Sequence, residues 1–278
     1  MSAATLQPRD GDLALAIETS NPSSLAPAGL GASVLGVTLA RWQSAAGGWL
    51  ELRTEPIASP TPQHDDLAAC IERCAAAASV VPRDLRIVAV SAGPGGFTSV
   101  RIAIVAAKMI AETTGAACIG VPTAAALAAR FAALHQPTTN FAIALASKNA
   151  DAHVTCYRPP TWHGLPAHES AVGLGGHFGR SLLSPTPLAP GALCDARKLT
   201  TLTETHHLTH LLADRFLPPA MLEHATTLGL RLMEPAFHPL AVLDAALLHT
   251  PVDPAQLLPI YPREPEAVRK WRAMRQGG

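Results

Sequence analysis

A strand, a glycine- and proline-rich turn and a helix follow one another between Arg86 and Ala111, and no other feature of the chain constrains its fold as strongly. Arg86 to Val90 is a β-branched apolar run, which is typical of a buried strand. The turn is Gly93 to Gly96, and the residues from Ile102 to Ala111 have the composition of a helix. This order is half of a βαβ unit, in which ligand loops and partner surfaces commonly lie at the turn.

Three apolar runs precede this unit and predict an antiparallel meander. Turn residues separate the runs, and the third run alternates as a half-buried strand does. The predicted strands are Leu13 to Ile17, Ala32 to Ala40 and Trp49 to Ile57. A helix is predicted next, from Gln63 to Val80. Its apolar residues recur at spacings of three and four and lie on one face, at Leu67, Cys70, Ile71 and Cys74.

The helix after the glycine turn is predicted to begin at an N-cap, Thr98 or Ser99, and to stop at Gly115. A short strand, Cys118 to Val121, and a helix, Thr123 to Leu134, are predicted next. A second sheet is predicted to contain the strands Phe141 to Ala146 and His153 to Tyr157, and further helices are predicted over Leu208 to Phe216 and Pro239 to His249. The opening order β-β-β-α-β-α is that of a half-domain of the actin, sugar-kinase and Hsp70 superfold. We therefore predict an α/β, actin-like/Hsp70-like (ASKHA) two-lobed fold with mixed β-sheets.

The predicted domain boundaries follow this order. Residues 12–124 form an N-terminal actin-like lobe, residues 125–255 a C-terminal lobe with a proline-rich insert, and residues 256–278 a tail that returns to the first lobe.

The charge, the apolar runs and the cysteines of the chain limit which partners and which cellular compartment we expect. The formal net charge of the 278 residues is zero, so no overall field draws the chain to nucleic acid or to a membrane. No apolar run reaches the ~18 residues of a membrane span, and the first residues lack the apolar core of a signal peptide. Cys70 and Cys74 are expected to be small buried thiols rather than metal ligands or a disulfide. A cytoplasmic location fits these features.

Two segments offer a weak nucleotide site. Backbone N–H groups of the glycine turn, at Gly95 and Gly96, would cradle a phosphate at a helix N-terminus. Thr19 and Ser20 close the first strand beside an acid, and an acid at this place organises metal and phosphates in actin-like kinases. The turn lacks the lysine of a P-loop. The alternatives are a tight turn that packs the helix on its strand and a partner surface.

The helix after the turn is smooth and weakly charged. Its small and apolar residues let another helix approach closely, so it is either wedged in a core or used as an interface. The residues concerned are Val100, Ala103, Ile104, Ala106, Ala107 and Ile110. The residue pattern leaves both alternatives open.

No catalytic centre is visible, because the chain shows no paired carboxylates, no Ser-His-Asp order and no G-x-S-x-G elbow. His206 and His210 stand four apart and would share one face of a helix, a spacing that can hold a metal, although 12 histidines make chance pairs expected. We expect no metal site. The tail from Tyr261 to Gly278 carries five positive and two negative residues. It would contact RNA phosphates or an acidic protein partner, or else form a solvated terminal helix.

Five segments resemble the TsaB (YeaZ) family. Ala16 to Ser20 resembles its opening AIDT[AS], Gly93 to Ile102 its GPGSFTGVRIG, and Gly120 to Thr123 its GVSTL. His64 stands where the family has a histidine that opens the first helix, and Pro259 to Arg263 resembles a C-terminal PxYLR. The likeness is best in the N-terminal half and returns at the C-terminus.

The resemblance implies a non-catalytic subunit that binds a TsaD-type transferase and supports N6-threonylcarbamoyladenosine formation in tRNA. The implied partner-binding residues lie on the first two helices: Leu67, Ile71, Phe97, Val100, Ala103, Ile104, Ala106, Ala107 and Ile110. The resemblance further implies no cofactor of its own, ATP at the partner interface, a TsaE-like ATPase as another partner, and tRNA reached through the complex. A homodimer through the same helices is an open alternative.

Several residues depart from the family pattern. Ser99 and Ala103 replace glycines, and Met109 replaces a further small residue, so the packing distance at the helix face is expected to change. Glu18 replaces the usual aspartate, and Ala146 to Lys148 replaces Asp-Ala-Arg. A competing hypothesis makes the chain an enzyme in its own right, either an ATP-binding transferase or a metallopeptidase-like glycoprotease.

Overall fold

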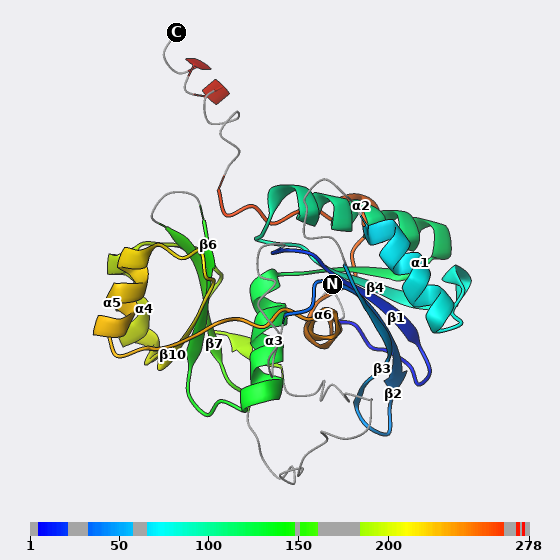
Figure 1. The fold of residues 1–278 in the computed structure, drawn as a ribbon, viewed down its shortest axis with the longest axis horizontal. Helices are drawn as coiled ribbons and strands as arrows, with labels where there is room; N and C mark the ends of the chain where they lie inside the picture. The colour runs from blue at the N-terminus through cyan, green and yellow to red at the C-terminus, as the bar shows by residue number, and fades with distance from the viewer. Residues whose placement is uncertain are drawn as a thin grey trace.

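The computed structural model describes residues 5–21, 33–57, 66–147, 151–160 and 184–263, together with residues 271, 272, 274 and 275. Two β-sheets stand side by side with two helices between them, and further helices cover their outer faces (Figure 1). The predicted α/β architecture with two mixed sheets is confirmed. Within the described part of the chain, no helix is long and apolar enough to cross a membrane.

The first lobe is built on a five-stranded sheet of order β3-β2-β1-β4-β5. Strands β1, β2 and β3 are antiparallel neighbours, whereas β4 and β5 continue the sheet parallel to β1. Their bounds are β1 Leu13–Glu18, β2 Gly36–Gln43, β3 Gly48–Pro56, β4 Leu85–Ser91 and β5 Ala117–Val121. The predicted meander is therefore confirmed, and a helix joins the parallel pair β4 and β5 as a βαβ unit requires.

Helices α1 (Leu67–Ala77) and α2 (Phe97–Thr114) cover the same outer face of this sheet and share one apolar core with it (Figure 1). Helix α2 ends as predicted, because Gly115 takes a left-handed conformation (φ 74°) that suits glycine. Its N-cap is Gly96 rather than Thr98 or Ser99, and Ser99 Oγ instead donates back to the Gly96 carbonyl at 3.1 Å. The predicted start of the first helix, residues 63–65, lies outside the described residues.

The second lobe is built on a sheet of order β11-β10-β6-β7-β8, with β9 paired to β7. Helices α4 and α5 cover its outer face, where they share a core with β6, β7 and β10. The bounds are β6 Phe141–Ala146, β7 Ala152–Arg158, β8 Thr186–Pro187, β9 Ala192–Cys194, α4 Ala196–His206, β10 His210–Ala213, α5 Pro219–Thr227 and β11 Arg231–Met233.

The helix predicted over Leu208 to Phe216 is wrong. Strand β10 occupies this run and pairs in parallel with both β6 and β11. A short apolar strand that is buried on both faces has no alternation, so its pattern does not distinguish it from a buried helix.

Helices α3 (Thr123–His135) and α6 (Pro239–Ala246) form the layer between the two sheets (Figure 1). All eight residues of α6 are buried, and α6 shares a core with the inner face of the first sheet. Helix α3 reaches the second sheet, where Phe131 meets Phe141 edge-on with ring centroids 4.8 Å apart. Although α6 lies within the predicted 125–255 lobe, its packing belongs to the first sheet.

Three charged residues meet at this layer: Asp244 on α6 is buried, and Arg130 on α3 and Glu51 on β3 are partly buried. Asp244 is 9% exposed, and Arg130 feels the charges of both Asp244 and Glu51. Asp244 Oδ1, Arg130 Nε and Glu51 Oε2 each lack a hydrogen-bond partner among the described residues. Burial raises the pKa of Asp244 to about 7, and the positive charge of Arg130 limits the rise.

We expect protonation of Asp244 to stabilise the fold. A carboxyl group with a raised pKa in the folded state adds stability that is complete below its unfolded pKa of 3.8 and is lost as the pH rises through about 7. Between these limits, the free energy of unfolding of the wild type should fall by about 4 kcal/mol relative to that of Asp244→Asn. Urea unfolding of both proteins across this pH range measures the difference in their free energies of unfolding. A difference that does not change with pH would contradict the raised pKa of Asp244.

Candidate functional site

Helix α2 has one face turned into the first lobe and one face turned to solvent. The inward residues pack on the sheet and on α1; they are Val100, Ala103, Ile104, Ala107 and Ala111. The outward face carries Phe97, Val105 and Met109, whose exposed fractions are 56%, 54% and 64%. We call these three residues the α2 ridge. Large apolar side chains exposed together on one helix are typical of an interaction surface.

The residues predicted to bind a partner divide between the two faces. Five are buried in the chain's own core, where they hold α1 and α2 on the sheet: Leu67, Val100, Ala103, Ile104 and Ala107. Ile71, Ala106 and Ile110 are partly buried at the edge of that core. Phe97 is exposed. A rigid partner therefore has access only to Phe97 and to the three partly buried residues. The five buried residues lie beneath this surface and support it.

The departures from the family pattern on α2 lie in different surroundings. Ser99 is half-buried in the first turn, Ala103 is fully buried, and Met109 is exposed. Only Met109 therefore adds bulk to the outward face of the helix. His64 and Lys148 lie outside the described residues.

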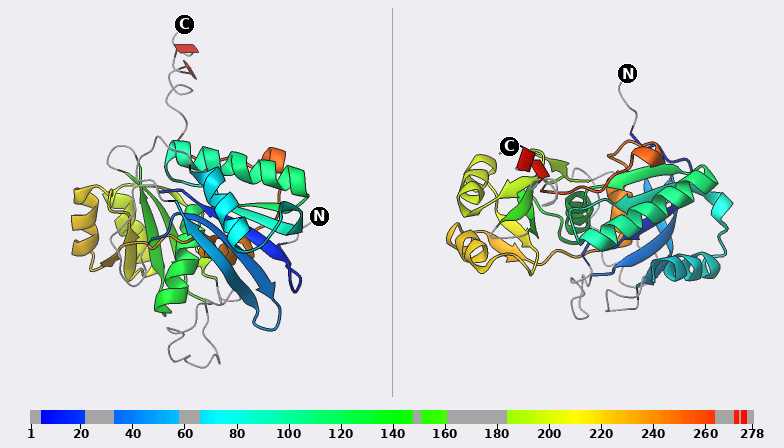
Figure 2. Two further views of the ribbon diagram at one scale, coloured as in Figure 1. Left: turned by 45° about the vertical axis from the view of Figure 1, so that its right-hand side comes forward. Right: turned by 90° about the horizontal axis from the view of Figure 1, so that it is seen from above.

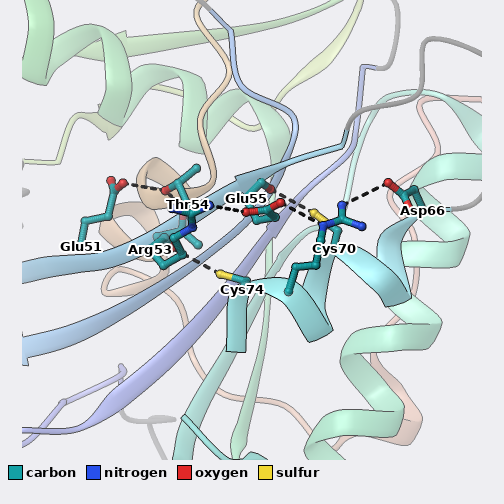
Figure 3. A network of polar contacts seen from close by, with 9 residues as sticks. Glu51, Arg53, Thr54, Glu55, Asp66, Cys70 and Cys74 are labelled. Carbon is teal, nitrogen blue, oxygen red and sulfur yellow. Dashed lines mark hydrogen bonds and ion pairs between the residues drawn. The ribbon is translucent and has the colours of Figure 1, made fainter. Parts of the chain in front are cut away.

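Helix α1 is tied to strand β3 by a polar network (Figure 3). Arg73 on α1 contacts Glu55 on β3 at 3.0 Å and Asp66, which precedes the helix, at 3.2 Å. Arg53 also contacts Glu55, at 2.8 Å, and the two arginines lower the pKa of Glu55. Both arginine side chains are more than 40% exposed, so these pairs orient α1 more than they stabilise it.

Cys70 and Cys74 lie on the buried face of α1 and are free thiols. Their Sγ atoms donate to the carbonyls of Glu55 and Arg53 on β3, at 3.1 and 3.5 Å. Burial raises the pKa of both thiols to about 11, so they stay protonated at neutral pH. The expectation of small buried thiols is confirmed for this pair.

The glycine turn packs directly against the end of β1. The Gly96 N–H donates to the Ser20 carbonyl oxygen at 2.6 Å, and a Cβ on Gly95 would lie 2.1 Å from the same oxygen. The Thr19 hydroxyl donates to the Ser99 carbonyl of α2 at 3.1 Å. Glycine is needed here because two backbone segments approach each other closely.

The structure thus brings together the four residues of the predicted nucleotide site, but their polar groups largely bond within the chain. The hydroxyl of Thr19 and the N–H of Gly96 already have acceptors. Ser20 is fully buried, and its Oγ has no partner among the described residues. A phosphate at this place would have to displace existing backbone contacts. Nucleotide binding therefore stays a prediction.

Polar groups also join the two lobes beside the glycine turn. Asn21, which follows β1, donates through Nδ2 to Asp214 Oδ2 at 2.8 Å, and Asp214 follows β10 of the second sheet. The Phe216 N–H donates to Asp214 Oδ1 at 2.9 Å, which fixes the carboxylate. The lobes are therefore bridged where the strand ends of the two sheets face each other.

Glu18 is buried at the end of β1. This burial raises the pKa of Glu18, and hydrogen bonds from Ser20 and Ser91 oppose the rise.

The structure separates His206 from His210. Helix α4 ends at His206, His207 takes a left-handed conformation (φ 50°), and His210 begins β10. The predicted shared helical face is wrong, because the helix stops between the two residues. Within the described ranges, no group of three or more His, Cys, Asp or Glu side chains could hold a metal.

Two features of the outward surface were missing from the sequence prediction, which had named Met109 only as added bulk on the helix face. The first is Val105: Val105 and Met109 follow Phe97 at multiples of four residues, and this spacing on a helix was the available signal. The second is the contact of Tyr261, which stacks on Phe97 with ring centroids 5.4 Å apart. No local pattern indicates that contact, because it joins segments far apart in the sequence.

Comparison with known proteins adds a family model and solved structures. Residues 62–148 match the family model described as TsaD, tRNA N6-adenosine threonylcarbamoyltransferase. This range begins just before α1 and ends just after β6, so it contains both helices of the outward surface. No curated protein matches the chain.

Two solved structures from Pseudomonas aeruginosa share the fold. One, described as a protein with similarity to peptidase YeaZ, is 17% identical with a TM-score of 0.59, over 91% of this chain and 100% of that one. The other, described as YeaZ, is 17% identical with a TM-score of 0.56, over 90% of this chain and 99% of that one. The likeness therefore extends over both lobes.

These findings agree with the sequence motifs at the first strand, the glycine turn and the C-terminus. The shared fold confirms the ASKHA-like architecture. The chain is therefore similar to a TsaD-family model over residues 62–148 and to YeaZ in its fold.

Proposed function

We propose that the chain is a non-catalytic subunit that binds a TsaD-type threonylcarbamoyl transferase and supports threonylcarbamoyladenosine formation in tRNA. The observation that carries the proposal is the α2 ridge, Phe97, Val105 and Met109, which is exposed on the lobe that the family model matches. In this proposal a TsaE-like ATPase and the tRNA join through the transferase, and ATP binds at the partner interface.

The chemistry of the surface suits a helical partner. Beside the ridge, α1 presents small exposed side chains at Ala68, Ala76 and Ala77. Small residues let helices pack at the short end of the 8–10 Å range of interaxial distances. Exposed aromatic and methionine side chains are enriched at protein interfaces. The same surface would also serve a second copy of this chain, which makes a homodimer the competing occupant.

We expect Val105→Arg and Met109→Arg to abolish binding of the transferase without unfolding the chain. Both positions are exposed, and arginine is a good helix former, so the melting temperature should stay unchanged. A charge buried without a partner at an interface costs about 3–5 kcal/mol, which weakens binding at least 100-fold. Calorimetric titration with the organism's TsaD-type protein measures the loss, and light scattering of the free chain reports a homodimer.

Thr201→Arg is the matched control, because Thr201 is exposed on α4 of the second lobe and should leave affinity unchanged. Ala103→Glu is unsuitable as a test, because Ala103 is fully buried and a charge there would unfold the lobe. Full affinity in both ridge variants would refute the proposed surface. Loss of a homodimer without any transferase binding would assign the ridge to self-association.

The enzymatic alternative is tested by nucleotide binding to the free chain. Because the Thr19 hydroxyl and the Gly96 N–H already bond within the chain, we expect ATP with Mg²⁺ to leave the melting temperature unchanged. A ligand present at 100 times its dissociation constant would add about 2.7 kcal/mol of stability, which a thermal scan detects readily. A clear rise in the melting temperature would instead favour a nucleotide site in the free chain.

A further inference from the structure

The C-terminal segment, residues 252–263, runs across the first lobe and reaches the second. The Val252 N–H donates to the Cys118 carbonyl of β5 at 2.9 Å, and Lys108 Nζ of α2 donates to the Ala255 carbonyl at 3.2 Å. Leu257 is buried over Gly120. The right-hand view of Figure 2 shows this orange segment passing from the first lobe toward the second.

The segment next reaches the glycine turn. The Ile260 N–H donates to the Ala92 carbonyl at 2.7 Å. Gly93 lies beneath it, and a Cβ there would stand 2.9 Å from the Ile260 carbonyl oxygen. The turn that begins α2 therefore packs against Ser20 on one side and against the C-terminal segment on the other.

Tyr261 then covers the exposed end of α2. Its ring stacks on Phe97, with centroids 5.4 Å apart and planes at 29°, and Arg101 lies over the same Phe97 ring with Cζ 4.9 Å from the centroid. Phe97 is the first residue of α2 and belongs to the α2 ridge. The position of Tyr261 thus determines how one end of the proposed partner surface is presented.

Two residues further on, the chain is anchored to the second lobe. Arg263 forms an ion pair with Asp151, the residue before β7. Both side chains are about two-thirds buried, with exposed fractions of 29% and 31%. Two residues span at most ~7 Å, so Tyr261 has little freedom to move while Arg263 is held.

We propose that Arg263 is a positioning residue for the partner surface: by holding the C-terminal segment on Asp151, it keeps Tyr261 on Phe97 and makes the presentation of the α2 ridge depend on the second lobe. The coupling is reciprocal, so a partner that binds the stacked form of Phe97 also strengthens the ion pair. Its consequence for partner affinity rests on the proposed function, whereas the coupling within the free chain does not.

The test reads the stack directly in the free, full-length chain. The sequence has only two tyrosines, so selective ¹³C labelling of tyrosine gives the NMR signals of Tyr261 and Tyr157 alone. Tyr157 is buried against Phe141 in the second lobe and serves as the internal reference. In Arg263→Gln and in Asp151→Asn, the Tyr261 ring signals should move to those of an unstacked ring while those of Tyr157 stay in place. Amide exchange at Ile260 should accelerate about fivefold.

Two further variants separate the ion pair from general effects of charge or size. Arg263→Lys should restore the wild-type Tyr261 signals, because the contact is a single N–O pair that an ammonium group can make. Arg53→Gln removes the half-exposed pair with Glu55 on β3 and should leave Tyr261 unmoved. Unchanged Tyr261 signals in Arg263→Gln and Asp151→Asn would overturn the proposal.

Partner binding distinguishes this proposal from the proposed function. If Arg263 positions Phe97, then Arg263→Gln and Phe97→Ala should weaken binding of the transferase by non-additive factors, because both act on one contact. Additive losses would overturn the link between Arg263 and the ridge. If Tyr261 moves as expected while the wild-type chain binds no transferase, the positioning role stands and the proposed function fails.

Discussion

The contact between the Ser20 carbonyl and the glycine turn determines where α2 begins and which way it faces. The Gly96 N–H donates to that oxygen, and a side chain on Gly95 would collide with it. Helix α2 starts at the next residue, so the contact sets which residues turn inward and which form the α2 ridge. The same turn receives Ile260 on its other side. The proposed partner surface and the C-terminal segment both depend on this backbone packing.

The glycine turn differs from a phosphate loop in where the Gly96 N–H points. A phosphate loop points its N–H groups at empty space, where an anion can enter. Here the Gly96 N–H points at Ser20, and Asn21 reaches Asp214 across the lobes. The strand ends of the two sheets are thus linked by hydrogen bonds between groups of the protein itself.

The first lobe could be predicted closely from sequence because its signals are local. Strand β1 is a short apolar run, and Gly115 ends α2 through its own backbone freedom. In the second lobe, β6 and β7 were also predicted from local apolar runs, but β10 was not. Strand β10 is stabilised by parallel neighbours on both sides and has no periodicity of its own. Similarly, small size alone did not reveal that Ala103 faces inward and Ala106 partly outward, because alanine gives little contrast around a helix. The stack of Tyr261 on Phe97 joins distant segments and has no local signal at all.

Helix α6 has a consequence for how the chain acquires its structure during synthesis. It comes late in the sequence, yet all eight of its residues are buried and its apolar partners are on the first sheet. While the ribosome makes the second lobe, the inner face of that first sheet therefore lacks its cover, although every one of its strands already exists. The core on the inner face of the first sheet is therefore complete only after residue 246 has been synthesised.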